Sequence, residues 1–490
     1  MRSAGVLLAI SSLPSPYGIG TLGKEAYHFV DFLVAAGQRY WQILPIGPTG
    51  FGNSPYQSLS SYAGNPYYID FDMLVEDGLL TKKEIEDIAW GKEGTIDYGL
   101  LYQNRYAVLK KATDRLPLVH PEDYFSFLEK ESYWLQDYAI YMAIKQDQNG
   151  KSWKTWPKEL RDCHSPEVFA KAKELQEEVL FYERIQYLFY TQYQTLKEYA
   201  TKNGIQIIGD LPFYVAEDSI DVWSHPEQFD LDEDHKMRYV SGMGPDCGCP
   251  EGQKWGNPLF DWQRQREEGY HWWMERAEHA FRFCDVLRLD HFQGYDTCFA
   301  IPFDGTPAEG CVRQGPGLEV FHRLEEAIGK KEFIVEDLGQ LTPEFMEMVK
   351  ESGFPGMRIL EYAFDPNDPG SIYNPWQYEK NSVAYTGTHD NNTLAGMEVD
   401  PNEQERVAQA KEYLGISKEE GFVQGMLRGV WASSSDMAII PMQDLLGLGS
   451  EARMNDPTGK TPCWSWRLVP DYDCKELAAR IKHKMKLYCR

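Results

Sequence analysis

Short apolar runs recur along the chain, and each ends in a polar or charged residue or beside a glycine, proline or asparagine. Runs of this length and with these boundaries predict buried strands. The stretches between them have helical character, and the clearest has Ser165 as N-cap, Pro166 at its first position and Gly204 just beyond its end. Eight strands alternating with helices predict a (β/α)8 barrel, which belongs to the α/β class. The runs are 5–10, 40–45, 205–210, 286–290, 333–336, 357–361, 383–386 and 437–441.

The spacing of these runs predicts where the barrel is interrupted. The second and third runs are much further apart than the roughly 30 residues that a strand and its helix need, and the fourth run also follows late. We therefore expect one catalytic barrel domain over 1–490, with large insertions after strands 2 and 3. The first, over 70–165, is predicted to be helical, and the second, over 215–275, to be rich in loops and to border the active site. A doubly wound sheet is the alternative, but no G-x-G-x-x-G follows the first run.

The net charge and the cysteines limit which ligands and which cellular compartment are expected. The chain has 49 Lys and Arg against 75 Asp and Glu, a formal net charge of −26. This charge opposes general binding to nucleic acids or anionic membranes, whose phosphates are also negative. The nine cysteines show neither a paired framework nor a zinc-ligand spacing, so we expect free thiols in a reducing compartment. Without a convincing signal peptide or membrane span, a soluble cytoplasmic protein is predicted.

Carboxylates stand at the ends of several predicted strands. Asp290, Glu336 and Asp210 each close a run, and Asp390 follows another shortly after it. In a parallel barrel these ends converge on the mouth where active sites lie. Taken singly, each carboxylate could cap a helix or pair with a neighbour such as Arg288. Taken together they favour a catalytic site, because apolar strands rarely end in charges that are not used.

Paired carboxylates around a C–O bond are what glycoside chemistry needs. Strand alternation directs Arg288 to the face that Asp290 occupies, so its charge is expected to keep Asp290 ionised as a nucleophile. Glu336 is followed by Asp337, and a crowded negative mouth would favour the protonated form that a general acid needs. Asp390 is then left to hydrogen-bond sugar hydroxyls and favour the oxocarbenium-like transition state.

Three segments, 288–292, 335–339 and 385–391, resemble the catalytic motifs of the 4-α-glucanotransferases. This family is also called the amylomaltases or disproportionating enzymes and is related to the α-amylases. The ordered set of matches covers nearly the whole chain and is highly specific. Further matches lie at 41–45, 54–58, 64–67, 209–212, 222–226, 252–258 and 453–455.

The resemblance implies roles for individual positions. Asp290 matches the family nucleophile, Glu336 the general acid/base and Asp390 the stabiliser of the transition state, in agreement with the roles argued from charge. The other matches are to residues that contact the sugar. They are Arg288, His291 and His389 at the cleavage point, Asp210 beside it, Tyr56 and Trp255 as aromatic platforms, Gln253 next to Trp255, and Asp365 as a weaker match.

The chain also departs from the family pattern. Cys247-Gly248-Cys249 stands where the family usually has an aromatic pair that grips glucan, so an extended acceptor path is expected to be weaker. Asn392 replaces an acidic residue, and 457–464 differs from the usual glycine-asparagine-tryptophan turn. None of these changes touches the three carboxylates.

The resemblance implies transfer of α-1,4-glucan segments from a donor to an acceptor glucan by a retaining double displacement. Maltooligosaccharides and amylose are the expected ligands, with no cofactor, metal, nucleic acid or membrane required, and nothing in the sequence identifies a protein partner. A retaining hydrolase that uses the same carboxylates is the alternative. A glucan-binding protein without activity is a third reading, but such a protein would not need three carboxylates at strand ends.

Overall fold

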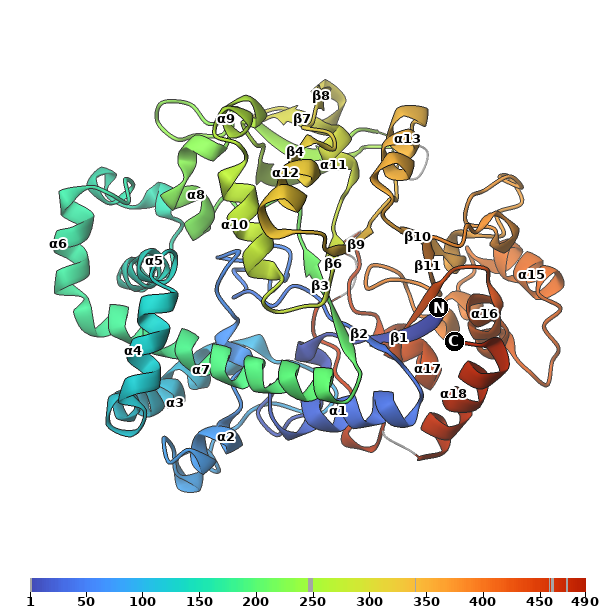
Figure 1. Cartoon of the computed structure of the whole chain (residues 1–490), viewed down its shortest axis with the longest axis horizontal. Helices are drawn as coiled ribbons and strands as arrows, with labels where there is room; N and C mark the ends of the chain where they lie inside the picture. Colours follow the sequence, from blue (N-terminus) through green and yellow to red (C-terminus); the bar gives the residue numbers. More distant parts are fainter. Residues whose placement is uncertain (1, 246–249, 340, 458, 460–461, 473–474) are drawn as a thin grey trace.

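The computed structural model describes residues 2–245, 250–339, 341–457, 459, 462–472 and 475–490. Over these residues, eight parallel strands close into a barrel in the order β1-β2-β3-β6-β9-β10-β11-β12, with β12 pairing back onto β1 (Figure 1). The predicted (β/α)8 barrel is therefore confirmed. The strands are β1 (Ser3–Leu7), β2 (Tyr40–Gln42), β3 (Gln206–Leu211), β6 (Val286–Leu289), β9 (Glu332–Val335), β10 (Gly356–Ile359), β11 (Ser382–Tyr385) and β12 (Met437–Pro441).

Both faces of the barrel strands are apolar, because one faces the interior and the other faces the surrounding helices. Leu7, Ile208 and Val383 belong to the interior cluster, whereas Val6 and Ile207 belong to the large cluster that includes the helices. This two-sided burial explains why the runs read as continuous apolar stretches. The helices that follow barrel strands include α1 (Lys24–Ala35), α10 (His271–Ala280), α12 (Glu319–Ile328), α13 (Pro343–Ser352), α14 (Leu394–Val399), α15 (Gln404–Tyr413), α16 (Phe422–Ala432), α17 (Met442–Leu446) and α18 (Lys475–Tyr488).

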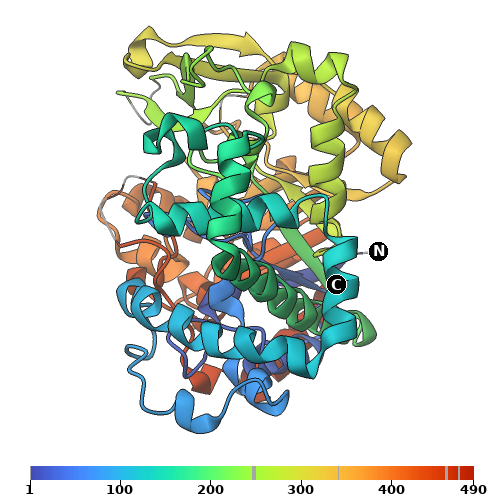
Figure 2. The same ribbon diagram turned by 90° about the vertical axis from the view of Figure 1, so that its left-hand side faces the viewer.

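Between β2 and β3 lies a group of helices that covers one side of the barrel (Figure 2). The Ser165 side chain accepts a hydrogen bond from the amide of Val168 at 3.2 Å, so the predicted N-cap is confirmed. The long helical stretch is divided in two at Leu175, whose ψ of 29° lies outside the helical range. The helices are α2 (Phe71–Glu76), α3 (Tyr98–Val119), α4 (Pro121–Lys130), α5 (Leu135–Asp147), α6 (Pro166–Glu174) and α7 (Gln176–Lys202).

A second sheet stands beside the barrel, and it corrects the prediction of loops over 215–275. Its order is β5-β4-β7-β8, with antiparallel pairing throughout. The sequence did not reveal β4 and β5, because β7, the second partner of β4, lies far along the chain and because Gly242 and Gly256 break the alternation. The strands are β4 (Tyr239–Met243), β5 (Gln253–Pro258), β7 (Thr297–Pro302) and β8 (Cys311–Gln314), with α8 (Ile220–Ser224), α9 (Trp262–Glu267) and α11 (Gln293–Asp296) nearby in sequence. Among the described residues, no helix is long and apolar enough to cross a membrane.

Candidate active site

Arg288 lies at the centre of the barrel mouth and contacts three carboxylates that come from three strands. Its Nη1 donates to both oxygens of Asp210 at 2.8 and 2.7 Å and to Oδ1 of Asp290 at 3.2 Å. Its Nη2 donates to Oε2 of Glu336 at 2.7 Å. Arg288 is 2% exposed, and so its charge acts on these groups with little screening by water. The convergence follows from the parallel strands, whose C-terminal ends share one face.

Glu336 has a second partner in the backbone. The amide of His291 donates to the same oxygen, Oε2, at 2.9 Å. His291 has a φ of 46°, in the left-handed region that non-glycine residues rarely occupy. Strain of this kind persists where the surrounding structure enforces it, and it often marks a functional site. The turn after β6 thus gives Glu336 an amide donor, and Oε1 is left to face other groups.

Asp390 lies at the far side of the mouth, in the segment that follows β11. His389 Nε2 is 3.3 Å from Asp390 Oδ2, and the side chain of Asn455 donates to Asp390 Oδ1 at 2.6 Å. The His389 ring stacks on Tyr56 with 5.0 Å between ring centroids. Tyr56 donates to Oδ2 of Asp210 at 2.9 Å, which links Asp390 to the cluster around Arg288.

The second sheet supplies the aromatic side of the site. Trp255 on β5 meets His291 edge to face, with centroids 5.0 Å apart, and its indole nitrogen donates to Gln253 at 2.9 Å. Tyr214, for which the sequence predicted no role, has its ring centroid 5.9 Å from that of His291. Trp255 is half-buried and Tyr214 is buried, and both line the cleft, where an aromatic face can pack on a sugar.

The predicted residues converge on one cleft of about 800 Å³. Volumes of this order are typical of sites that enclose a ligand. Arg288 bonds the cleft carboxylates of Asp290 and Glu336, and Asp210 in turn accepts from Arg288 and from Tyr56. The predicted residues that line the cleft are Tyr56, Gln253, Trp255, Asp290, His291, Glu336, His389 and Asp390, joined by Gln57, Tyr214, Asn257, Gln293, Asn455 and Trp464, for which no role was predicted.

Asp365 is the one predicted site residue that the structure does not bring to this cleft. It lies 3.8 Å from Arg406 and accepts a hydrogen bond from the amide of Asn367 at 2.8 Å. The three residues 247–249, on which the predicted departure from the family falls, lie outside the described residues. Asn455 could have been noticed, since 453–455 is one of the matching segments, but no spacing links it to Asp390 in the sequence.

The pKa values of Asp290 and Glu336 are shifted in the directions opposite to those expected from the sequence. Burial and the nearby negative charge of Glu336 raise the pKa of Asp290 well above its usual value. Burial would also raise the pKa of Glu336, but the Arg288 charge and hydrogen bonds from Asp290 and the His291 amide lower it to about 2. The two pKa values are therefore shifted in opposite directions, that of Asp290 toward the protonated form and that of Glu336 toward the ionised form.

The expectation that Arg288 ionises Asp290 while a crowded mouth protonates Glu336 therefore needs correction. Strand alternation correctly directs Arg288 into the mouth, but its shorter contact is with Glu336 and its longer one with Asp290. Asp337 does not crowd Glu336, because it is fully buried and bonded to Arg358 at 2.7 Å and to the amide of Met357 at 2.6 Å. Asp337 joins neighbouring strands and does not act at the mouth.

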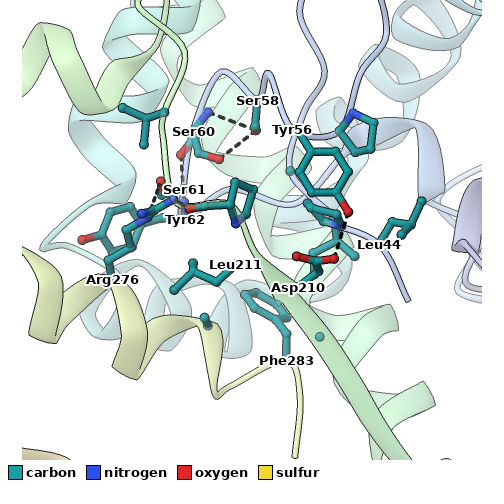
Figure 3. Close-up of a pocket in the computed structure, with 18 of the residues that line it drawn as sticks. Leu44, Tyr56, Ser58, Ser60, Ser61, Tyr62, Asp210, Leu211, Arg276 and Phe283 are labelled. Atoms are coloured by element: carbon teal, nitrogen blue, oxygen red, sulfur yellow. Dashed lines mark hydrogen bonds between the residues drawn. The ribbon is translucent and has the colours of Figure 1, made fainter. Parts of the chain in front are cut away.

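The loop that carries Tyr56 is anchored behind the cleft. A small cavity of about 80 Å³ lies there. Figure 3 shows the Tyr56–Asp210 bond at one end of it and Arg276 at the other. Arg276 on α10 donates to the Ser61 hydroxyl at 3.0 Å and to the Pro212 carbonyl at 2.6 Å. One buried cation thus ties the 55–63 loop to the turn after β3, and so fixes Tyr56 relative to Asp210.

A closed parallel barrel with carboxylates and aromatic rings in a cleft at its C-terminal mouth is typical of enzymes that act on glycosidic bonds. The comparisons with known proteins agree with this class. A family model described as 4-alpha-glucanotransferase matches residues 8–471. The chain therefore belongs to the 4-alpha-glucanotransferase family, and it is an enzyme that transfers hexosyl groups.

Individual relatives match over their full length. A 4-alpha-glucanotransferase of Clostridium butyricum is 43% identical over 484 residues, which are 98% of this chain and 99% of the relative. That of Thermus thermophilus is 41% identical over 492 residues, covering 98% of this chain and 97% of the relative. A solved structure, the amylomaltase from Streptococcus agalactiae in complex with acarbose, is 37% identical with a TM-score of 0.96, and each chain is fully covered.

Proposed function

We propose that this protein moves α-1,4-glucan segments between maltooligosaccharides, with Asp290 as nucleophile and Glu336 as general acid and base. The observation that carries this proposal is that one guanidinium bonds both carboxyls in the cleft: Arg288 donates to Asp290 at 3.2 Å and to Glu336 at 2.7 Å. Retaining enzymes place their carboxyls about 5–5.5 Å apart, whereas inverting enzymes leave about 6.5–9.5 Å for a water. Two carboxyls that share one guanidinium lie close together, which supports the retaining arrangement. Membership of the 4-alpha-glucanotransferase family supports transfer over hydrolysis.

In the first step an oxygen of Asp290 attacks C1 of the donor glucosyl unit. The C1–O bond to the leaving glucan breaks, and the leaving O4 takes the proton held by Glu336. Arg288 and the His291 amide hold Glu336 Oε2, which leaves Oε1 to carry that proton. The product is a glucosyl ester of Asp290 and a shortened glucan.

In the second step the 4-hydroxyl of another glucan attacks C1. Glu336 removes the proton from this hydroxyl, the bond between C1 and Asp290 breaks, and both carboxyls return to their starting state. Because both displacements occur at C1, the α configuration is kept. Asp390 then bonds to sugar hydroxyls and stabilises the positive charge that develops at C1 in each step.

In the free site the two pKa shifts favour a proton on Asp290, yet the reaction needs it on Glu336. The two forms have the same total charge, and so a donor sugar that enters between the carboxyls can select the reactive form without taking a proton from solvent. This transfer within the pair is part of the proposal.

Two further expectations belong to this proposal. Asp365 is proposed to reach the sugar only if the segment that carries it moves. The insertions 70–165 and 215–275 are proposed to act as subdomains of one barrel. A reducing, cytoplasmic setting is supported by the free thiols of Cys163, Cys284 and Cys298, which lie in the core.

Incubation with maltotriose alone tests the function. Transfer gives glucose together with a ladder of longer maltodextrins, whereas hydrolysis gives maltose and glucose and no ladder. A protein that only binds glucan leaves maltotriose intact. The Asp290→Asn variant, assayed in parallel, is the control for a contaminating activity.

A further inference from the structure

The segment 453–455, which matches the family motifs but has no role in the proposed reaction, lies directly against Asp390. The Asn455 side-chain amide donates to Asp390 Oδ1 at 2.6 Å, and the Asn455 backbone amide donates to the His389 carbonyl at 3.0 Å. Arg453 Nη2 donates to the Asp390 carbonyl at 2.9 Å, and its Nε donates to the Asn455 carbonyl at 2.7 Å. The segment therefore holds both the backbone and the side chain of Asp390.

The two carboxylate oxygens of Asp390 are held from opposite sides. Asn455 bonds Oδ1, and His389 Nε2 faces Oδ2 at 3.3 Å. A neutral imidazole with its proton on Nε2 donates to Asp390 and turns its Nδ1 toward the Tyr56 hydroxyl, 3.5 Å away. The Asp390 side chain is 40% exposed, so without these two contacts it would be free to rotate into solvent. Ordering of this kind is what a group that stabilises a transition state needs, because a misplacement of about 1 Å can cost about a hundredfold in rate.

We propose that Asn455 is a positioning residue of the reaction, whose side-chain amide orients the Asp390 carboxylate toward the reacting sugar. The proposal rests on the role of Asp390 in the proposed function. A neutral amide suits this task because it donates to the carboxylate without neutralising it. Asn455 thereby fixes the Asp390 carboxylate where it can stabilise the positive charge that develops at C1.

A double-mutant cycle with glucosyl fluoride as donor tests this role. Asn455→Ala should lower kcat by roughly ten- to a hundredfold, with a smaller change in KM. In an Asp390→Ala background the same substitution should have little further effect, because the residue through which it acts is gone. A loss of equal size in both backgrounds would mean that Asn455 contacts the sugar itself or supports the fold, and would overturn the proposal.

Fluoride release is measured whether the acceptor is sugar or water, so the cycle remains readable if the transferase proposal fails. A wild type that releases fluoride but makes no maltodextrin ladder refutes transfer alone. Asn392→Ala is the matched control, since the Asn392 amide bonds Ser450 at 3.0 Å and not Asp390. Its kcat should stay within about twofold of wild type, as expected for a position away from the reacting groups.

Asn455→Asp gives a second readout that a structural role would not produce. At acid pH one proton shared between the introduced carboxyl and Asp390 can bridge them as the amide did, whereas at higher pH both ionise and repel. The titratable and charged groups around the pair are His389, Tyr56, Tyr362, Arg453 and Asp456. All are kept in both proteins, so kcat of the variant should approach the wild-type value at acid pH and fall as pH rises. A pH profile parallel to that of the wild type would contradict the proposal.

Discussion

Arg288 shows how a single buried cation can set the charge of several acids. It bonds Asp210, Asp290 and Glu336 from the middle of the barrel, and it is the main reason that the pKa of Glu336 is low in spite of burial. The sequence could place these residues in the mouth through strand alternation. It could not show which guanidinium nitrogen reaches which acid, and the directions of the pKa shifts of Asp290 and Glu336 were therefore predicted incorrectly.

The Arg288→Gln variant should lose stability in a way that depends on pH. Buried carboxylates that lose their cation cost about 3–5 kcal/mol in the free energy of unfolding at neutral pH. The folded pKa of Glu336 is about 2, below its ordinary value of about 4.3, so its ionisation stabilises the wild type above pH 4.3 and this gain is lost as the pH falls toward 2. The difference between the two proteins should therefore shrink in acid. Urea unfolding at pH 7, 4 and 3 measures it, and a difference that does not change with pH would refute this explanation.

The Glu336→Gln variant should lose activity toward maltotriose but keep activity toward glucosyl fluoride. Maltotriose needs a proton on its leaving oxygen, and its turnover should fall by about a thousandfold or more, whereas glucosyl fluoride has a good leaving group and should still react with Asp290. Initial rates with the two donors give the comparison. Equal losses on both would remove Glu336 from the role of general acid.

At the scale of elements, buried strands were predictable and the second sheet was not. The barrel strands are apolar on both faces and so stand out in a single sequence, but β4 pairs with β7 over a long separation, with Val240 opposite Ile301. Likewise, the loop that carries Tyr56 depends on Arg276, which comes from a distant helix. Contacts of this kind leave no local pattern, and only the family resemblance pointed to Tyr56.

The Arg276→Met substitution should lower both the stability of the fold and the affinity for the donor. The substitution removes bonds to Ser61 and Pro212 and leaves the Asp221 carboxylate, which is 3% exposed, without its cation. We expect a loss of about 3 kcal/mol in unfolding free energy and a higher KM for maltotriose, because the Tyr56 loop shifts. Arg264→Met is the control, since Arg264 bonds Glu268 at the surface, where an ion pair contributes about 0–1 kcal/mol. Similar losses of unfolding free energy in the two variants would show that the buried Arg276 contributes no more than the surface Arg264.

At the scale of the whole molecule, the cleft joins residues from the barrel, the Tyr56 loop and the second sheet. A chain of sugars must cross from one to another, and we propose from the family resemblance that residues 247–249, which stand between β4 and β5 in the sequence, contribute to acceptor binding. Cys247 and Gly248 offer little surface for stacking. The double substitution Cys247→Tyr with Gly248→Phe should raise transfer to amylose relative to transfer to maltotriose. Product profiles on the two acceptors check this, and an unchanged ratio would show that the segment does not limit acceptor length.

The central claim is that Asp290 carries the glucosyl group between donor and acceptor. Its most direct test is mass spectrometry of Glu336→Gln after rapid mixing with glucosyl fluoride, because this variant should form the ester but remove it slowly. We expect one added glucosyl unit on the peptide that contains Asp290, which disappears when maltose is added and is absent when Asp290→Asn is combined with the same variant. An adduct on another residue, or turnover of glucosyl fluoride with no adduct under any quench, would contradict it.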